Sequence, residues 1–178
     1  MTRRSRFFRI HRAHLDPWWF SSDGTGRFDL PISTGQGTCY LAEEPTGCFL
    51  EVFRDWISVP ESEVAVRRIV EIALPAGARL ADCTATRARE FGLTAEIHSS
   101  SDYRIPQAWA EALYEAGFAG IRYFLRHDPS QTLVGAAWFG PAGPSAPPAR
   151  QVTAGKPIGS DLIEDVGRRF GILVLPSP

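Results

Sequence analysis

The order of strand-like and helix-like segments constrains the fold of this chain more than any other feature. Apolar or alternating runs typical of β-strands occupy residues 6–12, 37–42, 66–74, 79–82, 119–124, 133–139 and 172–175, with another near residue 152. Helical spacing of apolar residues occurs at about residues 45–56, 85–91, 106–116 and 160–170. These segments follow one another without an internal repeat and without regular strand–helix–strand alternation. This order predicts an α+β fold in which helices flank a mixed or antiparallel sheet.

Length and composition indicate one globular domain. The chain has 178 residues, of which 44% are hydrophobic and 22% charged, enough to bury a sizeable core. We therefore expect a single domain over residues 1–178. No sustained apolar run follows the basic N-terminus, so the sequence predicts neither a signal peptide nor a transmembrane helix. We expect a soluble, cytoplasmic protein that makes no membrane contact.

The charge balance argues against nucleic-acid binding. The formal net charge is −1, whereas nucleic-acid-binding domains usually carry a basic surface. The exception is a cluster of N-terminal arginines: Arg3, Arg4, Arg6, Arg9 and Arg12. We interpret this cluster as a solvated basic end rather than an arm that contacts DNA, and expect no direct nucleic-acid partner.

Cysteines and histidines give no sign of a disulfide framework or a metal site. Cys39, Cys48 and Cys83 are odd in number and lack CxxC spacing, so we expect buried thiols. The four histidines are His11, His14, His98 and His127. None of them has a third ligand nearby in the sequence, and we expect no metal centre.

The candidate chemistry lies between residues 24 and 51. Arg27 sits in a glycine-rich turn, Tyr40 in a short apolar strand and Glu51 on a predicted helix. Taken singly, a loop arginine is usually a solvated charge and a strand tyrosine is usually part of the core. Together, a cation, an aromatic ring and a carboxylate suit an anionic nucleotide with a cleavable sugar bond.

Helical spacing tests where Glu51 points. An apolar stripe at i, i+3, i+4 and i+7 comprises Phe49, Val52, Phe53 and Trp56. At about 100° per residue, Glu51 lies nearly opposite the centre of this stripe. The pattern therefore leaves two alternatives, a solvent-facing carboxylate or a carboxylate that lines a cleft.

Three adjacent aromatic residues precede the glycine-rich turn. They are Trp18, Trp19 and Phe20. Two interpretations are open. One is a core lid or loop anchor, and the other is a platform on which a base stacks; we favour the first.

The chain resembles the RES-domain family, which is named for an arginine, a glutamate and a serine. The resemblance covers most of the chain and rests on an ordered set of segments. These are residues 26–29 (GRFD), 37–42 (GTCYLA), 50–53 (LEVF), 102–103 (DY), 107–110 (QAWA), 120–123 (GIRY) and 126–129 (RHDP). No single segment is highly specific, but their order is.

The resemblance implies a fold related to ADP-ribosylating toxins and an enzyme that consumes NAD⁺. The nicotinamide–ribose bond would be cleaved by hydrolysis or by phosphorolysis to ADP-ribose 1″-phosphate, with inorganic phosphate as a second substrate and no cofactor. It also implies a toxin that is held inactive by an antitoxin of the Xre helix-turn-helix type. Self-association is left open.

The resemblance also suggests roles for five residues. Glu51 would stabilise the oxocarbenium-like sugar in the transition state. The planar guanidinium of Arg27 suits the pyrophosphate, and Tyr40 would stack on the cationic nicotinamide ring. Arg126 and His127 are expected to contact phosphate at the rim of the sheet.

One position departs from the family pattern. Where many relatives have the family serine, before the late arginine, this chain has Leu125, so the serine is missing or is supplied by Ser99, Ser100 or Ser101. Two other functions therefore stay open. One is a degenerate module that binds a nucleotide or an antitoxin without turnover, and the other is transfer of ADP-ribose to a macromolecule.

Overall fold

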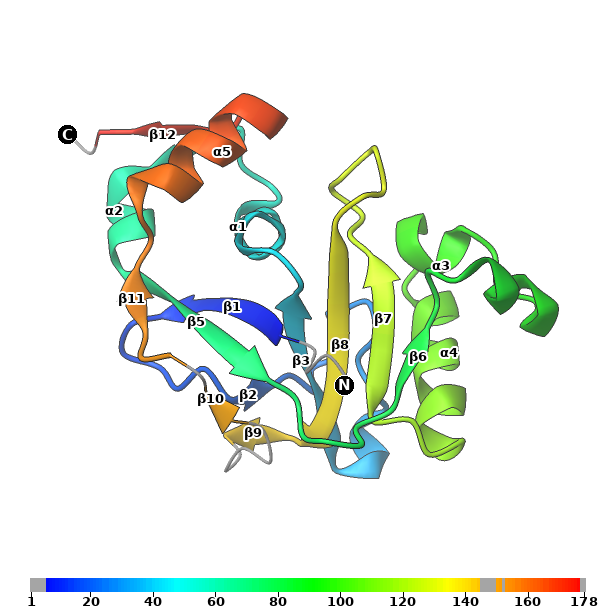
Figure 1. Ribbon diagram of the computed structural model, residues 1–178. Helices are drawn as coiled ribbons and strands as arrows, with labels where there is room; N and C mark the ends of the chain where they lie inside the picture. The colour runs from blue at the N-terminus through cyan, green and yellow to red at the C-terminus, as the bar shows by residue number, and fades with distance from the viewer. Residues whose placement is uncertain (1–5, 145–149, 152, 177–178) are drawn as a thin grey trace.

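The computed structural model describes residues 6–144, 150–151 and 153–176 and confirms an α+β fold with a mixed sheet (Figure 1). The main sheet runs in the order β10-β5-β1-β3-β8-β7-β6, and β11 also pairs with β5. Its strands are β1 (Arg6–Arg12), β3 (Gln36–Ala42), β5 (Arg67–Ala73), β6 (Leu80–Asp82), β7 (Gly120–Phe124), β8 (Val134–Pro141), β10 (Arg150–Gln151) and β11 (Lys156–Pro157). All its pairings are antiparallel except that of β6 with β7.

Two short strand pairs lie outside the main sheet. The strands β4 (Ser58–Pro60) and β12 (Leu173–Leu175) are parallel, whereas β2 (Trp19–Phe20) and β9 (Gly143–Pro144) are antiparallel. The β4–β12 pair joins the end of the chain to the segment that follows the first helix.

The helices gather on one face of the main sheet. They are α1 (Pro45–Phe53), α2 (Glu61–Ala65), α3 (Glu96–Ser99), α4 (Arg104–Glu115) and α5 (Ser160–Phe170), with 3₁₀ turns η1 (Ile32–Thr34) and η2 (Thr86–Phe91). Figure 1 shows α3 and α4 beside β6 and β7, α2 and α5 at the opposite side, and α1 between these groups. Residues of α1, α4 and α5 share one apolar cluster with β1, β5 and β7.

A second apolar cluster covers the other face of the sheet and contains two of the three adjacent aromatic residues. Trp18 and Phe20 are buried there, each edge-on to Trp138 at centroid distances of 5.9 and 5.8 Å. Trp19 is 52% exposed. The interpretation as a core lid is therefore right for Trp18 and Phe20 and wrong for Trp19.

Element boundaries differ most from the expectation in α1. Pro45 begins the helix as expected, but the helix ends at Phe53, three residues before Trp56. Trp56 is 44% exposed and does not extend the apolar stripe. The predicted helix over residues 85–91 is a 3₁₀ helix, and the predicted strand near Val152 consists of β10, with Val152 outside the described residues.

Arg9 is less solvated than the interpretation of the N-terminal arginines predicts, whereas Arg6 and Arg12 are exposed as expected. Arg9 donates to the carbonyl oxygens of Pro17 and Trp19 and to Sγ of Cys39, so its charge is used within the fold. Arg6 pairs with Glu71 on β5 at 2.8 Å. The interpretation as a solvated cluster is wrong for Arg9, while Arg3 and Arg4 lie outside the described residues.

The prediction of buried thiols is confirmed. Cys39, Cys48 and Cys83 are all buried and free. In the part of the chain that the structure describes, no helix combines the length and apolar character needed to cross a bilayer.

Candidate active site

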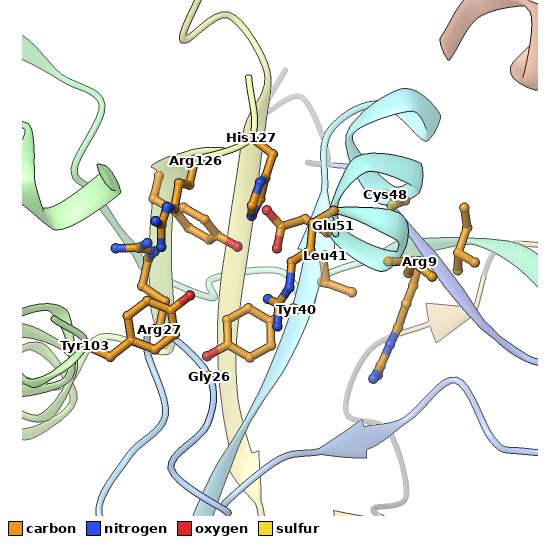
Figure 2. A pocket seen from close by; sticks show the side chains of 14 residues that line it. Arg9, Gly26, Arg27, Tyr40, Leu41, Cys48, Glu51, Tyr103, Arg126 and His127 are labelled. Carbon is orange, nitrogen blue, oxygen red and sulfur yellow. The ribbon is translucent and has the colours of Figure 1, made fainter. Parts of the chain in front are cut away.

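One cavity of about 200 Å³ brings the predicted site residues together (Figure 2). Its lining includes all five of them: Arg27, Tyr40, Glu51, Arg126 and His127. They come from a turn after β2, from β3, from α1 and from the loop between β7 and β8. Further lining is provided by Arg9, Ile10, Gly26, Leu41, Cys48, Val52, Arg54, Tyr103 and Tyr123. The topology thus gathers segments about 100 residues apart in the sequence.

The turn that carries Arg27 is held by Tyr40 and Asp29. The Tyr40 hydroxyl donates to Asp29 Oδ1 at 2.8 Å and accepts from the Phe28 amide at 2.9 Å. The other carboxylate oxygen of Asp29 accepts from the Gly26 amide at 2.9 Å. A Cβ atom at Gly26 would lie 2.3 Å from Asp29 Oδ1 and 2.4 Å from the Tyr40 hydroxyl, so only glycine fits this turn. The Tyr40 hydroxyl is therefore engaged, and its ring is what it offers to the cavity.

The guanidinium of Arg27 is buried but only partly hydrogen-bonded. Arg27 is 7% exposed and stacks over the ring of Tyr103, 4.7 Å from its centroid. Its Nη1 donates to the Ile97 carbonyl at 3.5 Å, while Nη2 has no hydrogen-bond partner among the described residues. Burial lowers the pKa of Arg27 from its ordinary value, but arginine stays charged in proteins. A buried unpaired donor costs free energy, which an anionic ligand would recover.

Glu51 lines the cavity rather than facing solvent. Figure 2 shows its carboxylate pointing from α1 into the cavity. Burial raises the pKa of Glu51 above its usual range, and the positive charges of Arg54 and Arg27 oppose that rise. The helix is buried on nearly every side, at Thr46, Gly47, Cys48, Phe49, Leu50 and Phe53. The cleft alternative therefore holds, and the face opposite the apolar stripe is not a solvent face.

Arg126 and His127 lie side by side in sequence at the edge of the cavity. Arg126 is exposed and His127 is half-buried. Burial lowers the pKa of His127, and the nearby charges of Arg54 and Arg126 lower it further. At neutral pH His127 therefore acts as a neutral hydrogen-bonding group, and Arg126 carries the charge.

Sequence reasoning assigned no role to two lining tyrosines. Tyr103 precedes α4 and supports the Arg27 guanidinium. Tyr123 lies on β7, is 2% exposed, and has a pKa raised well above its ordinary value by burial and by the charge of Glu51. Both belong to segments that carry the family resemblance, and that was the available signal. Among the described residues, no three His, Cys, Asp or Glu side chains are grouped to hold a metal ion.

None of the candidate positions supplies a serine hydroxyl to the cavity. Leu125 is fully buried. A Cβ atom added to Gly47 would lie 2.8 Å from Leu125 Cδ1, and one added to Gly135 would lie 2.6 Å from Leu125 Cδ2, so Leu125 packs directly against both glycines. Ser99 donates to the Ala95 carbonyl, and Ser100 donates to the Asp102 carbonyl. These two serines and Ser101 are absent from the cavity lining described above. Leu125 is thus a core residue.

Comparison with known proteins places the chain in a family. Among solved structures, a chain of the M. tuberculosis MbcT-MbcA toxin-antitoxin complex matches with a TM-score of 0.66 and 20% sequence identity. The match covers 90% of this chain and 87% of that chain. No match was found among the curated proteins. The model of the RES domain matches residues 6–157, which span the main sheet, α1 and every residue of the cavity lining. The chain therefore belongs to the RES domain family.

Proposed function

We propose that this protein cleaves the nicotinamide–ribose bond of NAD⁺. The observation that carries the proposal is the meeting of two groups in one cavity, the carboxylate of half-buried Glu51 and the unpaired Nη2 of buried Arg27. One favours a developing positive charge, and the other favours an anion. NAD⁺ offers both, at the sugar carbon and at the pyrophosphate.

The chemistry follows from charge development at the sugar. As the bond between C1′ and the nicotinamide nitrogen breaks, its electron pair leaves with nicotinamide and C1′ gains oxocarbenium character. Glu51 stabilises that charge, and the low dielectric of its surroundings strengthens the interaction. An acceptor oxygen then bonds to C1′ and loses its proton.

The other lining residues bind and orient the dinucleotide. Arg27 and Arg126 contact the pyrophosphate through planar guanidinium groups. The ring of Tyr40 stacks on the cationic nicotinamide, an interaction of about 0.5 to 2 kcal/mol. Because its hydroxyl is held by Asp29 and Phe28, the ring is already oriented before substrate binds.

The acceptor is water or inorganic phosphate, and the cavity lining favours neither. No serine hydroxyl contributes to the described lining, and the hydroxyls there belong to Tyr40, Tyr103 and Tyr123. Product analysis distinguishes the two acceptors, because hydrolysis gives ADP-ribose and phosphorolysis gives ADP-ribose 1″-phosphate.

We also propose an antitoxin partner of the Xre helix-turn-helix type. The support is family membership together with the match to a toxin-antitoxin complex. Expression of this chain alone should arrest growth and lower cellular NAD⁺, and co-expression of the cognate antitoxin should restore both. Growth arrest with unchanged cellular NAD⁺ would contradict the proposed cleavage of NAD⁺.

The direct test is NAD⁺ loss in the presence of purified protein, with Glu51→Gln as the matched control. We expect the wild type to release nicotinamide and the variant to release it at least about a hundredfold more slowly. Intact NAD⁺ after incubation with folded wild type would leave a binding module instead. ADP-ribose found on protein or nucleic acid would identify a transferase.

A further inference from the structure

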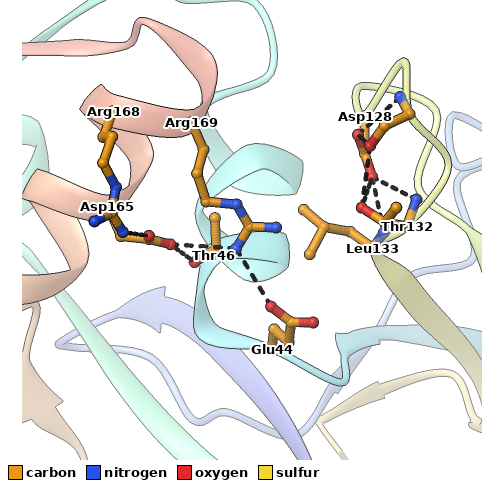
Figure 3. Close-up of polar contacts among 9 residues, drawn as sticks. Glu44, Thr46, Asp128, Thr132, Leu133, Asp165, Arg168 and Arg169 are labelled. Atoms are coloured by element: carbon orange, nitrogen blue, oxygen red, sulfur yellow. Dashed lines mark hydrogen bonds and ion pairs between the residues drawn. The ribbon is translucent and has the colours of Figure 1, made fainter.

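A single buried carboxylate organises the loop between β7 and β8 (Figure 3). Asp128 is 2% exposed. One of its oxygens accepts from the amide and the hydroxyl of Ser130, at 3.0 and 2.5 Å. The other accepts from the amide and the hydroxyl of Thr132, at 2.8 and 3.0 Å, and from the amide of Leu133 at 2.8 Å. These hydrogen bonds outweigh burial and hold the pKa of Asp128 well below its usual range.

The loop also contains an unfavourable backbone conformation. Gln131 has φ of +52°, the left-handed region, and it is the one described residue other than glycine with positive φ. Such conformations persist only where the surrounding structure holds them in place. The Gln131 amide donates to the Asp128 carbonyl at 3.0 Å, and Asp128 binds the residues on either side of Gln131. Asp128 thus stabilises the strained turn.

The base of the loop is fixed to the helix that carries Glu51. The Leu125 amide donates to the Leu133 carbonyl at 3.0 Å, and the Asp128 amide donates to the Leu125 carbonyl at 3.2 Å. Leu125 packs closely against Gly47 of α1, four residues before Glu51. Arg126 and His127 lie between Leu125 and Asp128 in the sequence, and both of these flanking residues are fixed by hydrogen bonds.

We propose that Asp128 is a positioning residue, which sets Arg126 and His127 at the cavity for the phosphates of the substrate. It does not line the cavity and acts only through those two residues. The proposal rests on the proposed function for the identity of the substrate. The loop geometry that carries it does not depend on that function.

The chain offers a matched control in Asp82. Asp82 makes the same kind of turn, accepting from the amide and the hydroxyl of Thr84 at 3.0 and 2.5 Å. Neither Asp82 nor Thr84 belongs to the cavity lining. Loss of either carboxylate should destabilise the fold, but only loss of Asp128 should affect substrate binding.

The experiment compares Asp128→Asn with Asp82→Asn. Melting temperature, kcat and KM for NAD⁺, and the Kd for ADP-ribose by calorimetry are measured for each. We expect both variants to melt at lower temperature. Only Asp128→Asn should raise KM and the Kd for ADP-ribose, by about tenfold or more, with kcat changed by less than about threefold, because displaced binding groups lose geometry.

A second comparison tests whether Asp128 acts through its neighbours. In a protein that already carries Arg126→Ala and His127→Ala, Asp128→Asn should cause no further rise in KM or Kd. If Asp128→Asn does not fold, Thr132→Val replaces it and should raise both constants by a smaller factor.

Three outcomes would overturn the proposal. The first is that folded Asp128→Asn and Thr132→Val keep the wild-type KM and ADP-ribose affinity. The second is that Asp82→Asn raises KM and the Kd for ADP-ribose as much as Asp128→Asn does. The third is that Asp128→Asn raises both constants by the same factor in the protein that carries Arg126→Ala and His127→Ala. Wild type that binds ADP-ribose but leaves NAD⁺ intact would contradict the proposed function alone, and the ADP-ribose affinities would still decide the role of Asp128. Wild type that neither binds ADP-ribose nor cleaves NAD⁺ would overturn the proposed function and the proposed role of Asp128.

Discussion

Two arginines, Arg27 in the cavity and Arg122 outside its lining, differ in how many of their hydrogen-bond donors have partners. Arg122 on β7 donates to Glu43, Asp82 and Thr84, so all three nitrogens of its guanidinium have partners. Arg27 is the more deeply buried of the two, yet its Nη2 has none among the described residues. The hydrogen bonds that Arg122 donates to Glu43 raise the pKa of Arg122, whereas burial lowers the pKa of Arg27.

The difference separates structure from binding. A partly buried ion pair with complete hydrogen bonding stabilises one arrangement of the strands, and removing one partner leaves the other charge without its counterpart. A buried guanidinium with an unused donor is an unfavourable feature in the absence of ligand. In this protein the second kind of arginine lines the cavity, and the first kind links β7 to β6 and to Glu43, the residue that follows β3.

The largest expected effect contrasts the carboxylates of the two regions. Glu51→Gln should lower kcat for NAD⁺ by about 10²- to 10³-fold, the range seen when one group that stabilises transition-state charge is removed. Glu43→Gln should leave kcat within about threefold and lower the melting temperature, because Arg122 loses its main partner. Steady-state kinetics with thermal melts measures both. Equal kinetic losses would erase the distinction between the regions.

Leu125→Ser sharpens the border between cavity and core. Because Leu125 is fully buried against Gly47 and Gly135, the change should destabilise the fold by about 2–5 kcal/mol, through lost packing and an unpaired hydroxyl. Phosphate dependence of NAD⁺ loss should not increase. Denaturant unfolding and turnover with and without phosphate check this. A stable variant with higher phosphate-dependent turnover would place position 125 in the cavity.

The next smaller effect compares the arginines directly. Arg27→Lys keeps the charge but loses the planar fork, and charge-assisted hydrogen bonds are worth roughly 1.5 to 3 kcal/mol, so NAD⁺ affinity should fall about tenfold to a hundredfold. Arg122→Lys should leave affinity unchanged. Calorimetry on the two folded variants gives the comparison, and unchanged affinity in Arg27→Lys would reduce Arg27 to a structural charge.

The smallest effect is a pH dependence that belongs to Glu51. Burial raises its pKa above the ordinary value of 4.5, so the folded protein retains a proton that the unfolded chain releases. The contribution to stability is complete below pH 4.5 and is lost as pH rises through the raised folded-state pKa. Relative to Glu51→Gln, the melting temperature of the wild type should therefore fall as pH rises above 4.5. Turnover should rise over the same interval as Glu51 ionises. Parallel melting curves would show that the carboxyl is solvated.

The sequence predicted the order of the longer elements well because each carries its own local pattern. It missed short ones whose patterns span only a few residues, among them β2, β4, β9, α2 and α3. It predicted the surroundings of Glu51 poorly. An apolar stripe assumes that a helix is covered on one side, but α1 lies between the sheet, α5 and the β7–β8 loop. Tertiary packing therefore buries the face that periodicity assigns to solvent, and it leaves Trp56 exposed.

The five predicted residues that line the cavity could be named from the sequence, but the residues that support them could not. Arg27, Tyr40 and Glu51 follow from a cation, a ring and a carboxylate in family order. The stacking of Tyr103 on Arg27 and the loop fixed by Asp128 depend on contacts between distant segments or on turn geometry. No periodicity encodes such contacts.

The three buried thiols make the molecule convenient to label. Cys48 borders the cavity, but burial raises the pKa of its thiol, and its Sγ donates to the Phe8 carbonyl. Burial also raises the pKa of Cys39, and that of Cys83 to about 12. Maleimides and iodoacetamides react with accessible thiolates, so the native cysteines should stay silent toward them. A single cysteine introduced at exposed Trp19 or Ile57 would then carry a fluorophore alone, without prior removal of native cysteines.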